Sequence, residues 1–162
     1  MVVVDSSALI PLARVGRLDL FTTTFDKIQT TEGVQNEVLT PGKQGTSVLA
    51  SFLERIAVCE TPPEAAQVAS LAGVAETDAA VILLAVDRGD MLLANDTALI
   101  ELAKTHEVAC WWVTTLLLNC THDGVLSPTE ATDLLYDLVG EGMNLHPKVY
   151  TQVQRKIREL GD

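Results

Sequence analysis

The chain has 162 residues, which predicts a single domain. Hydrophobic residues make up 48% of it, enough for a full core, but the longest apolar run, AAVILLAV, is far shorter than the roughly 20 residues needed to cross a membrane. The 22 acidic residues outnumber the 11 basic ones, and the formal net charge of −11 excludes a protein that coats nucleic acid through a basic surface.

The excess of acids has two interpretations. Part of the negative charge would be concentrated in a cation-binding site, and the rest would form a solvated surface, as in proteins adapted to a salty cytoplasm. Cys59, Cys110 and Cys120 are odd in number and have no CxxC spacing, so we expect reduced thiols. The N-terminus enters an apolar strand at once, without the pattern of a signal peptide. These features predict a cytoplasmic protein with no membrane partner.

Apolar runs alternate with helical patterns along the first two thirds of the chain. The expected strands are Val2–Val4, 27–30, 56–60, 91–94 and 108–113, and the expected helices are one through Ala8, Leu9 and Leu12 and those at 31–39, 46–54, 63–72, 77–89 and 97–105. Thr31 and Thr77 are expected helix N-caps, and Gly89 is an expected helix end. Alternation at this spacing predicts a parallel sheet with right-handed crossovers.

The pattern becomes wholly helical after Val113. The segment SPTE is a capping box, in which Ser127 caps the helix, Pro128 lies in its first turn and Glu130 reaches back. That helix is expected to end near Val139, and a last one should run from Pro147 to Glu159. The predicted fold is therefore an α/β/α sandwich with two extra C-terminal helices. We expect one domain over residues 1–162, with an α/β core at 1–113 and a helical extension at 114–162.

The late helices are rich in apolar residues, which suit either a homodimer interface or packing in the core.

 The residues concerned are Leu134, Leu135, Leu138, Val149 and Val153. Exposed apolar stripes of this kind often mark interfaces between protein copies. A homodimer and burial of these residues in the core both remain open at this point.

Four carboxylates from distant parts of the sequence are expected at one edge of the sheet. Asp5 follows the first strand and Asp96 follows the fourth, so both lie at carboxyl ends, where open parallel sheets bind ligands. The crossover helices begin at the same edge, which adds Asp78 in the first turn of one helix and Glu37 about two turns into another. Each acid also has an ordinary interpretation, because first-turn acids and N-caps are common and Glu37 suits a solvated helix face.

The convergence of these acids favours a metal site. Four carboxylates brought together without basic partners would repel one another, and a divalent cation removes that repulsion. Ligand sets made only of oxygen suit Mg²⁺ or Mn²⁺. Two such ions can clamp the attacking and leaving oxygens of a phosphodiester.

Four segments carry a resemblance to a known family: VVVDSSALI, TTEGVQNEVL, ETDAAVILLA and LLANDTALIELA. In this order and approximate spacing they resemble the PIN-domain ribonucleases, and the likeness covers most of the chain. The tail GVLSPTEATDLLYDLVGEGMNLHPKVY is similar to the C-terminal part of a prokaryotic PIN subgroup. The resemblance implies a Rossmann-like α/β/α fold. It also implies that the catalytic and metal-binding residues are Asp5, Glu37, Asp78 and Asp96, with Mg²⁺ or Mn²⁺ as cofactor.

Two further positions follow from the resemblance. Ser7 matches a position that is often Ser, Thr or Asn in the family, so its hydroxyl would orient Asp5 or a water in the metal site. Ala94 departs from the family pattern, which often has Thr or Ser two residues before the fourth acid. A supporting hydrogen bond is then missing, which puts the rate in question more than the metal site, and Asn95 is a candidate to replace it.

The resemblance implies a metal-dependent endoribonuclease, a phosphodiester hydrolase that cleaves single-stranded RNA. Its biological role stays open between the toxin of a toxin–antitoxin pair, with an antitoxin protein as partner, and an RNA-processing enzyme. The alternative is a catalytically weak or inactive PIN-like module that binds RNA or protein. Ala94 and the negative charge favour that alternative, whereas the retention of four mutually repelling acids counts against it.

Other candidate residues carry weaker signals. His106, His122 and His146 have no metal-binding spacing, and the pair His122–Asp123 lacks the Gly-x-Ser-x-Gly turn of a serine nucleophile. Trp111 and Trp112 could stack on bases, but neighbouring strand residues face opposite ways, so we expect one in the core and one beneath a helix. A haloacid-dehalogenase-type site would need a second Asp where Ser7 stands.

Overall fold

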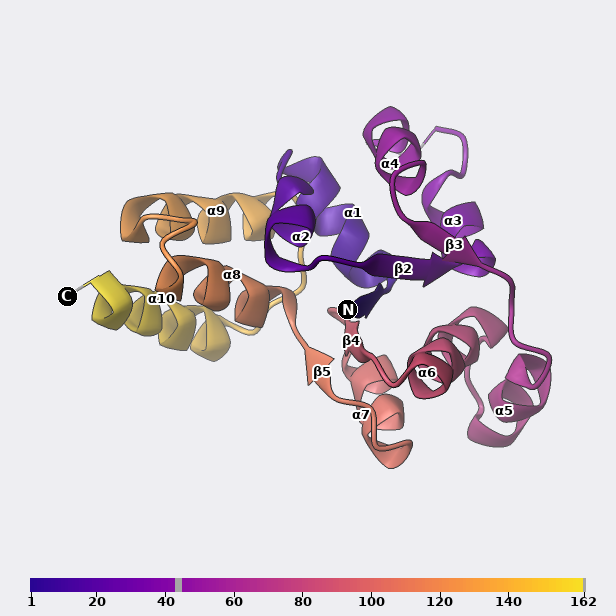
Figure 1. Cartoon of the computed structure of the whole chain (residues 1–162). Helices are drawn as coiled ribbons and strands as arrows, with labels where there is room; N and C mark the ends of the chain where they lie inside the picture. The colour runs from indigo at the N-terminus through magenta and orange to yellow at the C-terminus, as the bar shows by residue number, and fades with distance from the viewer. Residues whose placement is uncertain (43–44, 162) are drawn as a thin grey trace.

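The computed structural model of the chain describes residues 1–42 and 45–161 (Figure 1). The described residues form a parallel five-stranded sheet in the order β3-β2-β1-β4-β5, with helices on both faces. The α/β/α fold predicted from the sequence is therefore confirmed. The strands are β1 (Val2–Val4), β2 (Ile28–Thr31), β3 (Ala57–Cys59), β4 (Met91–Leu93) and β5 (Cys110–Trp111).

Seven helices in the described residues belong to the crossovers between strands. They are α1 (Ser6–Arg14), α2 (Asp19–Thr24), α3 (Glu32–Val38), α4 (Thr46–Leu53), α5 (Ala65–Ala72), α6 (Glu76–Arg88) and α7 (Thr97–Thr105). Figure 1 shows α1–α4 on one side of the sheet and α5–α7 on the other. This division follows from the strand order, because the chain moves outward from β1 to β3 and then returns to β4 on the opposite side of β1.

Strand β1 is the centre of the sheet. It pairs with β2 on one side and β4 on the other, and helix α6 packs against all three strands. Val2, Val3 and Val4 are consequently fully buried. A run of three valines suits a strand that is covered on both faces, as is usual in parallel sheets.

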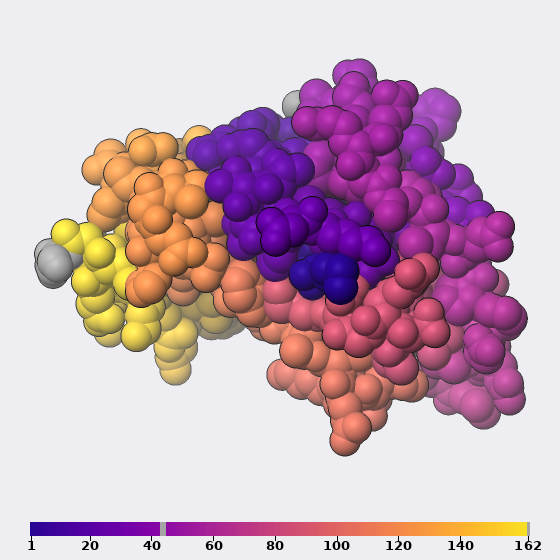
Figure 2. Space-filling view, viewed as in Figure 1, coloured from indigo at the N-terminus to yellow at the C-terminus, as the bar shows by residue number. Residues whose placement is uncertain are grey.

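Three helices follow the sheet within residues 113–161, where the sequence predicted two: α8 (Val113–His122), α9 (Pro128–Gly140) and α10 (Pro147–Gly161). The expected strand 108–113 is shortened because α8 begins at Val113, with Trp112 as its N-cap residue. The three helices pack on one another, and α8 and α9 also contact α2 and α1. They form a lobe beside the sheet, coloured orange to yellow in Figures 1 and 2.

The helix caps test the local sequence signals. Thr31 caps α3 by accepting a hydrogen bond from the Val34 N–H at 3.3 Å, as expected. Gly89 ends α6 in the left-handed conformation, with φ +65°. The prediction for Thr77 was wrong, because α6 begins one residue earlier and Ala75 is its N-cap residue without a side-chain bond. Thr77 faces α3 instead, and a Cβ added to Gly33 would lie 3.1 Å from its Oγ1.

Helix α2 was missed by the sequence analysis. Its sequence, DLFTTT, ends in three consecutive threonines, and β-branched residues lower helix propensity. Tertiary contacts outweigh this preference, because Leu20 and Phe21 are buried in the core.

The apolar residues that suggested a homodimer lie mostly in the core. Leu134, Leu135, Leu138 and Val153 are each at most 5% exposed, whereas Val149 is 37% exposed. Core packing therefore accounts for the apolar stripe, and a homodimer stays a prediction without this support.

Within residues 1–42 and 45–161, no single helix is long and apolar enough to cross a bilayer, although α5 and α6 taken together, bent by 117°, meet that requirement by length and composition.

The capping box of α9 gives a direct test of local stability. Ser127 Oγ accepts from the Glu130 N–H at 3.1 Å, and Glu130 Oε1 accepts from the Ser127 N–H at 3.4 Å. Ser127→Ala should lower the free energy of unfolding by about 1 kcal/mol, measured by urea denaturation, because a helix N–H loses its partner. Ser127→Asp should be close to neutral, and Thr129→Ala, in the same exposed turn, is the control. Equal stability of Ser127→Ala and wild type would contradict a capping role.

Candidate active site

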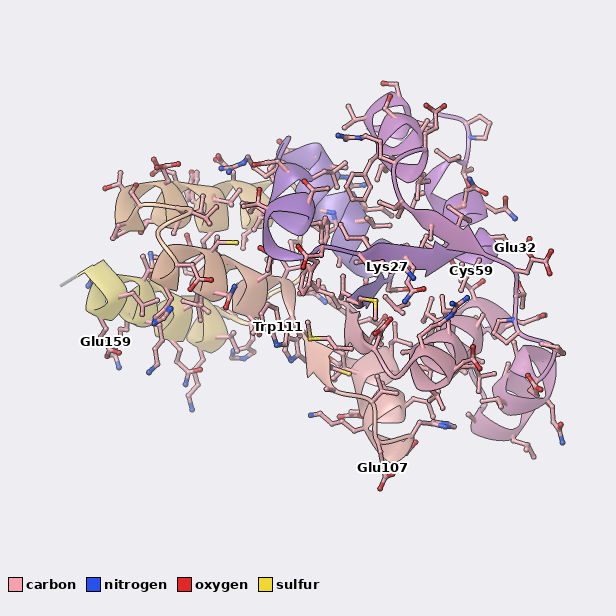
Figure 3. All side chains as sticks on the ribbon, in the orientation of Figure 1. Lys27, Glu32, Cys59, Glu107, Trp111 and Glu159 are labelled. Carbon is pink, nitrogen blue, oxygen red and sulfur yellow. The ribbon has the colours of Figure 1, made fainter. Side chains whose placement is uncertain are left out.

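The carboxyl edge of the sheet brings three strand ends to one level. Val4 pairs with Leu93, and Leu93 pairs with Trp111, so the next residues along the three strands, Asp5, Ala94 and Trp112, continue that row. The chain reverses its direction across the sheet between β1 and β4, and open α/β sheets bind ligands at such a reversal. Figure 3 labels Lys27 and Glu32, which bracket β2, and the carboxyl edge is the one toward Glu32.

Asp5 is a buried carboxylate at the end of β1. Its side chain is 4% exposed, and its Oδ2 accepts hydrogen bonds from the Ser7 N–H at 3.1 Å and from Ser7 Oγ at 2.6 Å. Asp5 is also the N-cap residue of α1. Burial raises the pKa of this carboxyl group, the hydrogen bonds from Ser7 oppose the rise, and the nearby charge of Glu37 adds to it.

Ser7 joins the ends of two strands. While its hydroxyl donates to Asp5, the same oxygen accepts from the backbone N–H of Asn95 at 2.9 Å. Ser7 therefore orients Asp5, one of the two roles considered from the sequence. Ala94 is fully buried, and its N–H donates to the Trp111 carbonyl at 3.0 Å. Asn95 contributes to the network around Asp5 through its backbone N–H, which donates to Ser7.

Glu37 and Asp96 flank Asp5 from two helices. Glu37 is exposed on α3, and its Oε2 accepts from Ser6 Oγ at 2.6 Å. Asp96 is the N-cap residue of α7, and its Oδ1 accepts from the Leu99 N–H at 2.9 Å. Asp5 and Asp96 thus act as helix caps and also lie at one edge, because the N-cap positions of α1 and α7 each lie within three residues of the carboxyl end of the preceding strand.

The pKa of Asp78 is affected by the other three acids. It lies in the first turn of α6 and is partly buried. Burial raises its pKa to about 6, and the charges of Asp5, Asp96 and Glu37 add to the rise. The structure therefore brings the other three predicted acids within electrostatic reach of Asp78.

The donor chemistry of this group suits a hard divalent cation. All four side chains offer oxygen, and no ion pair between described residues involves Asp5, Asp78 or Asp96. As the side chains are placed, no three His, Cys, Asp or Glu residues within 1–42 and 45–161 form a closed metal-binding group. The residue types thus fit Mg²⁺ or Mn²⁺, and a bound ion would require the carboxylates to move closer together.

The histidines and tryptophans lie apart from this group or beside it. His122 pairs with Asp123 at 3.1 Å on the exposed end of α8, and His146 Nδ1 accepts from the Lys148 N–H at 3.1 Å. Trp111 lies where β5 approaches α8, with its ring centroid 5.7 Å from that of Phe25 (Figure 3). Both tryptophans are partly buried and pack against the core, and Trp112 also lines a cleft next to Asn95.

Three contributors to the site were not found from the sequence. Ser6 holds Glu37 by a hydrogen bond, and Gly33 allows α3 to approach α6 closely. Asn144 accepts a hydrogen bond at its carbonyl from Asn95 Nδ2 at 3.3 Å. The first two lie within the motifs already singled out, but Asn144 comes from the loop before α10, and no local pattern links it to the sheet edge.

Residues 1–159 match the family DUF3368, described as a PIN domain. The chain belongs to the PIN domain family. Among solved structures, the PIN domain is similar to PAE2754 from Pyrobaculum aerophilum, with 24% identity, a TM-score of 0.54, and coverage of 73% of this chain and 94% of that one. This likeness shows the shared fold. A search of curated proteins gave no match. PIN domains are generally nucleases that use divalent metals, so the family agrees with the oxygen-rich site.

Asp78 makes the stability of the metal-free PIN domain depend on pH. Because its folded pKa of about 6 lies above the ordinary 3.8, ionising it costs stability as the pH rises through this range, and the cost persists above it. In chelator at pH 8, Asp78→Asn should melt about 2–4 °C higher than wild type, the shift produced by roughly 1 kcal/mol in a chain of this size. The stability change is taken as roughly 1 kcal/mol, less than the pKa shift would give by direct conversion, because Asp78 is partly exposed and solvent screens its charge.

The difference between Asp78→Asn and wild type should shrink as the pH falls below about 6 and vanish only below about pH 3, where Asp78 is protonated in both the folded and the unfolded chain. Glu76→Gln, which changes an exposed acid in the same turn of α6, serves as the control and should show no comparable gain. A lower melting temperature for Asp78→Asn at pH 8 would show that Asp78 is a structural acid and not a repelled one.

Ser7 is expected to stabilise the edge through its hydroxyl. Ser7→Ala removes the 2.6 Å bond to Asp5 and the acceptor for the Asn95 N–H, so denaturation should show a loss of about 1–3 kcal/mol. Ser6→Ala is the matched control, with an expected change within about 0.5 kcal/mol because its bond to Glu37 is exposed. Equal losses for the two variants would argue against a special role of Ser7.

Proposed function

We propose that this PIN domain is a metal-dependent endoribonuclease that cleaves single-stranded RNA. The observation that carries the proposal is the placement of four acids at the carboxyl edge of the sheet, where Asp5 follows β1, Asp96 caps α7 after β4, and Asp78 lies in the first turn of α6. The charges of Asp5, Asp96 and Glu37 also contribute to the raised pKa of Asp78. Acids that served only as helix caps would have no reason to lie where their negative charges repel one another. A site for divalent cations explains why four acids from four segments meet at the switch point of the sheet.

Asp5, Glu37, Asp78 and Asp96 would hold Mg²⁺ or Mn²⁺. When bound, the metal supplies Lewis-acid stabilisation of phosphodiester charge and a water that ionises more readily. Asp5 is the fixed member of the set, because Ser7 and burial hold its orientation. Glu37 and Asp96 are exposed at the same edge, where solvent and a ligand can reach their carboxylates.

The character of the edge favours single-stranded RNA over a duplex. Glu37 and Asp96 lie at an exposed edge, and a flexible single strand can present one phosphate there with fewer of its neighbours against an acidic surface. The chain would act in the cytoplasm, as its three free cysteines suggest. Its role would be that of a toxin held by an antitoxin protein or of an RNA-processing enzyme.

A second candidate is a weakly active or inactive module that binds RNA or protein. Two observations favour it: Ala94 offers no side-chain hydrogen bond beside the site, and the carboxylates of the described residues do not form a closed metal-binding group. The two candidates differ in one measurable property, which is metal-dependent cleavage.

Cleavage of a labelled single-stranded RNA tests the proposal. Purified wild type should cut it with Mn²⁺ and stop when a chelator is added. Asp5→Asn and Asp78→Asn should each reduce the rate by at least about 100-fold, because changes to groups that only support metal ligands already cost about 10–100-fold. Glu76→Gln is the matched control and should retain the wild-type rate.

The outcomes separate the candidates. Equal cleavage by wild type and Asp5→Asn would assign the activity to a contaminant or another site. If wild type binds RNA but leaves it intact with Mn²⁺ and with Mg²⁺, the chain is the binding module.

A further inference from the structure

A cleft of about 710 Å³ lies beside the acidic edge. Asn95 and Thr97, the two neighbours of Asp96 in the sequence, line one side of it. Trp112 and the segment that opens α10, including Asn144 and His146, line the rest. The volume falls within the range of small-ligand sites in proteins, which is about 300–1,000 Å³.

The position of Trp112 relative to Asp5 follows from the sheet register. Both residues directly follow paired positions, with β4 between their strands. Two strand spacings separate them, which is roughly 10 Å between backbones. A group in the cleft is therefore close to a group bound at the acids without overlapping it.

The lining is neutral, in contrast with the acidic edge. Among the described residues, the cleft is lined by Asn, Thr, Trp, Leu, His, Pro and Val side chains, and by no Asp, Glu, Lys or Arg. A phosphate would find no cation there. A flat, uncharged ring with polar edges would find an aromatic surface in Trp112 and amide groups in Asn95 and Asn144.

The cleft is also connected to the acidic site by hydrogen bonds. The Asn95 backbone N–H donates to Ser7 Oγ, which holds Asp5, while Asn95 Nδ2 donates to the Asn144 carbonyl. The Asn95 side chain keeps its carbonyl oxygen and a second N–H for a ligand. His146 Nδ1 accepts from the Lys148 N–H, an arrangement that leaves the proton of the neutral ring on Nε2 as a donor.

We propose that this cleft binds one nucleobase of the RNA substrate, stacked on Trp112, next to the nucleotide whose phosphate lies at the acids. The inference rests on the proposed function for its substrate. It assigns to Trp112, Asn95 and Asn144 the binding of a base, and it gives the helical lobe a part in substrate binding, because the loop before α10 closes one side of the cleft.

Binding in the absence of metal tests the inference. A fluorescein-labelled single-stranded RNA decamer is titrated with protein in chelator, so that no cleavage occurs, and anisotropy reports the Kd. Trp112→Ala should weaken binding by about 5- to 100-fold, the loss expected for one stacked base. Trp112→Phe keeps an aromatic ring and should stay within about threefold of wild type. Trp111→Phe is the matched control, because Trp111 packs against Phe25 instead.

Intrinsic fluorescence gives a second readout that does not depend on the stability of Trp112→Ala. The chain has two tryptophans, so Trp111→Phe leaves Trp112 as the sole emitter and Trp112→Phe leaves Trp111. RNA should quench the emission of the first protein and leave that of the second unchanged. Quenching carried by Trp111, or equal RNA affinity of folded Trp112→Ala and wild type, would overturn the inference.

The two proposals fail in different ways. If RNA quenches Trp112 and wild type does not cleave it with Mn²⁺, the base site stands and the nuclease function fails. If wild type cleaves RNA and Trp112→Ala binds and cleaves equally well, the nuclease function stands and the base site fails. An RNA that wild type neither binds nor cleaves would overturn both.

Discussion

The rest of the site depends on one buried carboxylate. Asp5 must end a strand that is covered on both faces, and a buried charge is tolerated only with hydrogen-bond partners. Ser7 supplies them from the first turn of α1, and its oxygen is in turn fixed by Asn95 at the end of β4. One network thus satisfies the charge, begins a helix and joins two neighbouring strands.

The remaining acids add repulsion to this network instead of relieving it. Burial and the negative charges of Asp5, Asp96 and Glu37 raise the pKa of Asp78 to about 6. A chain shaped only for stability would replace at least one of these acids, since neutral Asn caps helices equally well. Stability lost at a site in this way is typical of functional residues, and packing elsewhere balances the loss, here the fully buried β1 and the buried face of α6.

Much of the fold and the placement of the four acids at one edge could be predicted, because both follow from local patterns and one topological rule. Alternating apolar runs predicted the parallel sheet, and carboxyl ends placed Asp5 and Asp96 together. The failures have a common cause in tertiary contacts. Helix α2 forms against its threonine propensity because Leu20 and Phe21 are buried, and Thr77 faces Gly33 instead of capping α6. The Asn95–Asn144 bond joins residues 49 positions apart, which no local pattern encodes.

The acidic edge and the neutral cleft together offer a way for a negatively charged protein to bind RNA, which is itself negatively charged. With a net charge of −11, the protein gains little from general attraction to phosphates, which supplies most non-specific binding in basic proteins. Divalent cations at the acids would offset the negative charge where one phosphate lies, and stacking on Trp112 would add affinity that does not depend on charge. The two contributions act on adjacent groups of one strand, and Asn95 connects them because its backbone supports Asp5 through Ser7 while its side chain lines the cleft.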